Sequence, residues 1–144
     1  GENIVNALIK PMEVLQQEKK NKNKAIEVLN FLEIEHLCYE YAGNLSGGQK
    51  KLLELGRTMM AKPRIVLLDE PGAGVNPTLM VKLANNIRRL NIEKGYTFCI
   101  IEHDMDLIAS LCDPIIVLTN GSVLLKGTIE EVRSSESVRE AYLG

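Results

Sequence analysis

The sequence lacks the features that mark a secreted or membrane-embedded protein. No apolar run in its 144 residues approaches the roughly 18 residues that a membrane span requires. The start, Gly-Glu-Asn, has neither the basic nor the apolar region of a secretory signal. The three cysteines, Cys38, Cys99 and Cys112, are odd in number and follow no metal-binding spacing. We therefore expect a soluble cytoplasmic protein with reduced thiols, in which Cys99 is a small core residue.

An excess of charge of one sign is also missing. The chain has 17 Lys and Arg against 19 Asp and Glu, and the net charge of −2 indicates no general polyanion-binding surface. Residues 16–24 are a local exception, because they hold one acidic residue and four lysines: Lys19, Lys20, Lys22 and Lys24. No aromatic residues are interleaved with these lysines. We interpret the stretch as a solvated helix end and loop, and we expect no nucleic-acid partner.

Helical periodicity dominates the first part of the chain. Residues 3–10 show one apolar helical face, which Pro11 interrupts. A second helix is predicted over residues 24–32, with four inward positions: Ala25, Val28, Leu29 and Leu32. After an irregular link, a third helix is predicted from Gln49 to Pro63, with an apolar stripe at Leu52, Leu55, Gly56, Met59 and Met60.

Strands and helices alternate in the second part. Buried strands are predicted at residues 65–68 and 97–101, separated by a helix that Asn76-Pro77 begins and Gly95 ends. A short helix capped by Asp104, a hairpin around Asn120-Gly121 and one or two helices from about residue 129 follow. The order predicts an α/β fold, with a helical subdomain at residues 1–62 and half of a parallel sheet at residues 63–144.

A glycine-rich turn opens the helix predicted from Gln49. Residues 45–50 are Leu-Ser-Gly-Gly-Gln-Lys. The free backbone N–H groups of such a turn and the positive end of the helix dipole favour an anion. Taken alone, Ser-Gly-Gly is more often only a flexible turn. The candidate phosphate contacts are Ser46, Gly47, Gly48 and Gln49.

Polar residues follow both predicted strands. Asp69 and Glu70 end the first strand, and His103 lies just beyond the second. Asp69 is the candidate metal ligand, and Glu70 is the candidate base for an attacking water. The competing interpretation is that Glu70 begins a solvated loop. For His103, the alternatives are a structural role, a phosphate contact, or a partner that orients Glu70.

Together and in this order, these sequences resemble the motifs of ABC-type ATPases. Residues 45–50 resemble the signature motif, residues 65–70 the Walker B motif, residues 72–77 the D-loop, and His103 the H-loop histidine. Residues 71–77, 101–105 and 138–144 look most like the ATP-binding subunits of branched-chain amino-acid importers. One departure is Asn76, where many ABC proteins have aspartate. Asn76 keeps the capping role and loses the charge.

The resemblance implies ATP and Mg²⁺ as ligands, with Asp69 at the metal. It also implies a pair of ATP-binding subunits, homo- or heterodimeric, in which the signature turn contacts the nucleotide of the opposite subunit. Transmembrane permease subunits would hold the pair at the inner face of the membrane.

An important part of the ABC pattern is absent. No Gly-x-x-x-x-Gly-Lys-Ser/Thr sequence occurs, and the Q-loop glutamine has no counterpart. We expect a C-terminal part of a larger subunit that is inactive by itself. The alternatives are a non-enzymatic fragment that packs or dimerises, and a soluble ABC ATPase that acts on nucleic acid or ribosomes.

Overall fold

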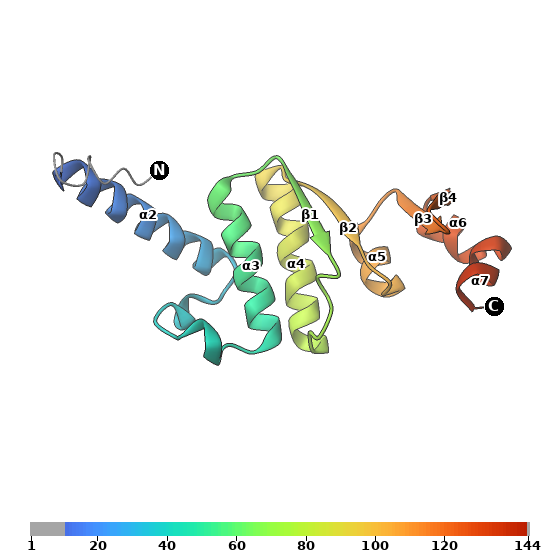
Figure 1. Cartoon of the computed structure of the whole chain (residues 1–144), viewed down its shortest axis with the longest axis horizontal. Helices are drawn as coiled ribbons and strands as arrows, with labels where there is room; N and C mark the ends of the chain where they lie inside the picture. Colours follow the sequence, from blue (N-terminus) through green and yellow to red (C-terminus); the bar gives the residue numbers. More distant parts are fainter. Residues whose placement is uncertain (1–10, 144) are drawn as a thin grey trace. The chain divides into compact units, whose positions relative to one another are not determined.

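The computed structural model describes residues 11–143, so the helical face predicted over residues 3–10 lies outside the described residues (Figure 1). The chain divides into two compact units. The first extends to Arg64 and includes Gly74–Leu79, whereas the second contains Ile65–Ala73 and the chain from Met80 onward. The subdomain boundary predicted between residues 62 and 63 stays a prediction. Within residues 11–143, no helix is both long and apolar enough to cross a membrane.

Helix α2 of the first unit, Pro11–Phe31, corrects the prediction of a loop followed by a shorter helix. Gln, Glu and Lys are good helix formers, so the polar stretch at residues 16–24 continues the helix instead of ending it. Pro11 does not break this helix, because at the first helical position its missing N–H group has no intrahelical partner to lose. Val28 and Leu32 are buried, as predicted, and Ala25 and Leu29 are half-buried.

Two 3₁₀ turns, η1 at Glu35–Leu37 and η2 at Ala42–Asn44, lead from α2 to helix α3, Gly47–Ala61. Helices α2 and α3 pack closely at Gly56. A methyl group added there would lie 2.9 Å from Leu32 Cδ1 and 3.2 Å from Val28 Cγ1. The Lys24 ammonium also donates a hydrogen bond to the Met60 carbonyl at 2.6 Å. This contact joins Lys24 of α2 to the C-terminal end of α3.

Strands β1, Ile65–Asp69, and β2, Thr97–Ile101, form a parallel pair in the second unit. Helix α4, Pro77–Lys94, connects them and buries an apolar stripe at Leu83, Ile87 and Leu90. Gly95 follows α4 with φ of +69°, a conformation that glycine adopts without steric cost. The parallel sheet, the connecting helix and their limits confirm the predicted fold class.

The prediction that both strands are fully buried is wrong. Side chains alternate between the two faces of a sheet, and only one face of β1 and β2 is covered. On the other face, Leu67 is 76% exposed and Ile101 is 64% exposed. Cys99 shares this face and is exposed, so it is not the core residue that its apolar neighbours suggested.

The C-terminal elements enclose their own core. They are α5 (Met105–Leu111), β3 (Ile115–Thr119), β4 (Ser122–Gly127), α6 (Ile129–Ser134) and α7 (Glu136–Leu143). Strands β3 and β4 form the predicted hairpin, with Asn120 and Gly121 at positive φ as a type I′ turn requires. Helices α6 and α7 pack on this hairpin. The buried cluster consists of Ile108, Ile115, Val117, Val132 and Val138.

Candidate functional site

Glu70 follows β1 in a tight, held turn. Its φ is +44°, in the left-handed region that non-glycine residues seldom adopt. The Glu70 N–H group donates to the Ile101 carbonyl at 2.9 Å, which extends the β1–β2 pairing by one residue. The Glu70 carbonyl accepts from the Ala73 N–H group at 3.1 Å and closes the turn. The backbone thus reverses immediately after the strand, and the Glu70 side chain is 54% exposed.

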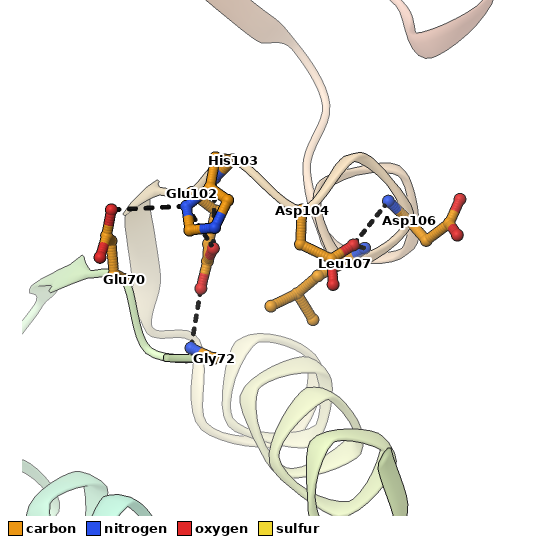
Figure 2. A network of polar contacts seen from close by, with 7 residues as sticks. All are labelled: Glu70, Gly72, Glu102, His103, Asp104, Asp106 and Leu107. Carbon is orange, nitrogen blue, oxygen red and sulfur yellow. Dashed lines mark hydrogen bonds and ion pairs between the residues drawn. The ribbon is translucent and has the colours of Figure 1, made fainter. Parts of the chain in front are cut away.

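The structure brings Glu70 and His103 together. His103 Nδ1 lies 3.4 Å from Glu70 Oε1, and the two side chains face each other from the ends of neighbouring parallel strands (Figure 2). The imidazole is 75% exposed, so solvent or a ligand reaches the pair. With Nδ1 turned toward Glu70, Nε2 is the ring nitrogen left for an external partner.

Glu102 is the residue that sequence reasoning missed. Its side chain is only 2% exposed, and it lies beneath the His103 ring in Figure 2. Oε1 accepts a hydrogen bond from the Gly72 N–H group at 2.7 Å, and Oε2 accepts one from the His103 N–H group at 3.2 Å. The alternation of β2 could have revealed it, since Glu102 continues the inward-facing series of Phe98 and Ile100.

Asp69 is exposed at the last position of β1, opposite Ile101. Its carboxylate has no hydrogen bond or ion pair in the described part of the chain. Among the residues that the structure describes, no group of three or more His, Cys, Asp and Glu side chains could hold a metal ion. The Asp69 carboxylate is exposed and therefore accessible to a metal ion. Its role as a ligand stays a prediction.

The turn that opens α3 is organised by a capping box. Ser46 Oγ accepts from the Gln49 N–H group at 3.3 Å, and Gln49 Oε1 accepts from the Ser46 N–H group at 2.8 Å. In the part of the chain that the structure describes, the Gly47 and Gly48 N–H groups have no acceptor. These are the first-turn amides that an α-helix cannot satisfy internally. These two N–H groups are therefore available to bind an anion at the positive end of the α3 dipole.

Close packing explains the two glycines of this turn. A methyl group on Gly47 would lie 3.3 Å from the Gly74 carbonyl, and one on Gly48 would lie 2.9 Å from Leu79 Cβ. Gly74 and Leu79 belong to the same unit as the turn. Asn76, between them, caps α4 by accepting from the Leu79 N–H group at 3.0 Å. The sequence correctly predicts this cap.

The segment after His103 is fixed in the same local way. Asp104 Oδ1 accepts hydrogen bonds from the N–H groups of Asp106 and Leu107 at 2.9 and 3.0 Å (Figure 2). The cap begins α5 directly after the histidine, as predicted. His103 therefore lies between two fixed points, the end of β2 and the start of α5.

The chemistry of these residues fits Mg²⁺ and ATP. A hard divalent cation prefers carboxylate oxygens, and Asp69 offers one that is exposed. Phosphate oxygens need N–H donors, which the Gly47 and Gly48 amides supply. Asp69, Glu70 and His103 belong to the second unit, and Ser46, Gly47, Gly48 and Gln49 belong to the first.

Solved structures that share this arrangement of parallel strands are ATP-binding cassettes of ABC transporters. A family model described as "ABC transporter" matches residues 3–73. A nucleotide-free ATP-binding cassette from an ABC transporter superposes with a TM-score of 0.82 at 36% identity, covering 100% of this chain and 57% of its own. The ADP conformation of another cassette gives a TM-score of 0.80 at 40% identity, covering 87% of this chain and 50% of its own.

The relatives by sequence are named for branched-chain amino acids. The chain is 41% identical to the probable branched-chain amino acid transport ATP-binding protein LivG of Archaeoglobus fulgidus, over 90% of this chain and 50% of that protein. It is 37% identical to the high-affinity branched-chain amino acid transport ATP-binding protein BraF of Pseudomonas aeruginosa, over 99% of this chain and 56% of that protein. The chain thus spans about half the length of the curated relatives it matches.

Proposed function

We propose that this chain is the C-terminal half of an ATP-binding subunit that couples ATP hydrolysis to the import of branched-chain amino acids. The observation that carries the proposal is the Glu70–His103 pair, 3.4 Å apart at the ends of adjacent parallel strands. The names of the relatives support the solute class. The first half of such a subunit would supply the Walker A loop, which occurs nowhere in these 144 residues.

In this proposal, three residues of the second unit act in hydrolysis: Glu70, His103 and Asp69. Glu70 accepts a proton from, or polarises, the water that attacks the γ-phosphate. His103 orients the Glu70 carboxylate through Nδ1 and presents Nε2 to a phosphate oxygen. Asp69 would hold Mg²⁺, directly or through water, and the metal would supply countercharge to the phosphates. The left-handed turn at Glu70 keeps its carboxylate at the strand end.

The signature turn acts on a second subunit. We propose that the Gly47 and Gly48 amides and the capped Ser46 contact the nucleotide held by the opposite ATP-binding subunit, so that ATP joins the two. Transmembrane permease subunits are the further partners, which places the protein on the cytoplasmic face of the membrane as a peripheral component.

The test uses the complete subunit that contains this chain. Glu70→Gln preserves the size of the side chain and removes the charge that polarises water. Loss of a positioned general base lowers turnover by about 10²–10⁴-fold. ATP binding should persist, so this variant should accumulate as an ATP-dependent dimer in size-exclusion chromatography with light scattering.

Two further variants complete this test. Ser46→Arg in the Glu70→Gln background should abolish the dimer, because a bulky side chain fills the start of α3. Glu130→Gln makes the same chemical change on the exposed face of α6 and should leave turnover unchanged. If Glu70→Gln hydrolyses ATP at the parent rate, Glu70 is not the base.

A further inference from the structure

Glu102 is a buried carboxylate with two distinct partners. One oxygen accepts from the amide of Gly72, two residues after Glu70, and the other accepts from the amide of His103. The two donors are 31 residues apart in the sequence and come from the segments that follow β1 and β2. A single side chain therefore ties together the backbones that hold the two candidate catalytic residues (Figure 2).

A carboxylate is well suited to this position. It has two acceptor oxygens and no donor, so it can serve two backbone N–H groups at once. Hydrogen bonds to a charged acceptor are stronger than those between neutral groups. No lysine or arginine pairs with Glu102 within residues 11–143. The groups that offset the cost of burying its carboxylate are the two backbone amides and the His103 ring, whose Nδ1 lies 3.9 Å away. Burying a carboxylate costs free energy unless it is hydrogen-bonded, so this position favours the arrangement in which both amides donate to it.

The turn after Glu70 is shaped to receive this carboxylate. A methyl group on Gly72 would lie 2.9 Å from Glu102 Oε1 and 2.6 Å from Met80 Cε, so it would displace the ends of both side chains and disturb the contact with Glu102. Gly72 has no positive φ, so the requirement at this position is space and not backbone conformation.

We propose that Glu102 is a positioning residue that sets the separation between Glu70 and His103. This inference rests on the proposed function, because it assigns those two residues the hydrolytic step. Glu102 touches neither nucleotide nor water in this role. It acts on turnover by holding the turn at residues 70–73 and the start of the histidine loop at a fixed distance.

The first experiment uses the 144-residue chain and does not depend on hydrolysis. Its two histidines, His36 and His103, give separate imidazole ¹⁵N signals in NMR, and exposed His36 is an internal reference. Glu70→Gln should shift the His103 signals in the parent chain. In the Glu102→Gln background the same substitution should shift them less, because the pair is no longer held together. A response of undiminished size would overturn the proposal.

The second experiment measures turnover in the complete subunit. Misplacing catalytic groups by about 1 Å can cost 10²-fold in rate, so Glu102→Gln should lower kcat by about 10- to 100-fold. KM for ATP should not change, because Glu102 does not contact the nucleotide. The double variant Glu70→Gln/Glu102→Gln should be no slower than Glu70→Gln, since residues that act as one unit are not additive.

The outcomes separate the two proposals. An unchanged kcat in Glu102→Gln, or a rise in KM with kcat constant, contradicts the positioning role. If Glu102→Gln lowers turnover by the same factor in the Glu70→Gln background as in the parent, Glu102 acts independently of Glu70. That result would also contradict the positioning role. If the parent subunit does not hydrolyse ATP, the proposed function fails, and the NMR response alone decides whether Glu102 holds the pair. Glu130→Gln is the matched control in both experiments.

Discussion

The two regions with candidate phosphate chemistry are built in opposite ways. The hydrogen bonds of the turn at Ser46 are local, since its capping box joins residues three positions apart. The Glu70–His103 region is non-local, since Glu102 joins segments 30 residues apart and the histidine lies 33 positions beyond Glu70. Local order needs only the right residues in sequence, whereas non-local order needs the folded sheet. We expect the capping hydrogen bonds of the first region to tolerate disturbance of the fold and the Glu70–His103 region to depend on the fold.

The largest effect on stability should come from adding a methyl group at a closely packed glycine. Gly72→Ala places a methyl group against Glu102 and Met80, and overpacking of this kind costs about 1–3 kcal/mol in the free energy of unfolding. Gly43→Ala is the matched control, because nothing lies within 4 Å of its added methyl group. Urea unfolding of both variants measures the difference. Equal stability would mean that the turn at Gly72 yields easily and is not held as described.

Two capping boxes in the chain allow the contribution of a helix cap to stability to be compared between the two units. Ser46 with Gln49 and Thr128 with Glu131 form the same capping box, in different units. Ser46→Ala and Thr128→Ala should each lower the free energy of unfolding by about 1 kcal/mol. Only Ser46→Ala should also weaken the ATP-dependent dimer of the complete subunit, measured in the Glu70→Gln background. If Thr128→Ala weakens that dimer equally, the effect belongs to stability and not to the turn.

The smallest effect should follow loss of an exposed ion pair. Arg133 lies 3.1 Å from Asp106 and links α6 to α5 beyond His103, but the Asp106 side chain is 95% exposed. Such pairs contribute about 0.2–1 kcal/mol. Arg133→Ala should therefore lower stability by no more than this, without changing turnover. A large fall in turnover would show that the held region extends through α5 into the C-terminal helices.

Local signals in the sequence predict much of the fold. The Asn76-Pro77 start of α4, the cap at Asp104 and the Asn120-Gly121 turn are each fixed by a few neighbouring residues, and the structure confirms them. The parallel pairing of β1 and β2 follows from their alternation with α4.

Other features depend on contacts that a sequence does not display. The length of α2 was underestimated because polar residues weakened the periodic pattern while keeping good helix propensity. The exposure of Leu67 and Cys99 depends on what covers each sheet face, which residue type does not reveal. Sequence reasoning did not single out Glu102, although its position in the alternation of β2 places its side chain inside.

The exposure of Cys99 makes the open face of the β1–β2 sheet chemically addressable. Desolvation by burial, and secondarily the nearby Cys99, raise the pKa of the Cys112 thiol and so reduce its reactive thiolate at neutral pH. Cys38 is half-buried, which leaves Cys99 as the favoured target for a maleimide dye. A polarity-sensitive fluorophore attached there lies on the same face as Leu67 and Ile101. Its emission would report, in real time, when that face passes from water to a protein interior.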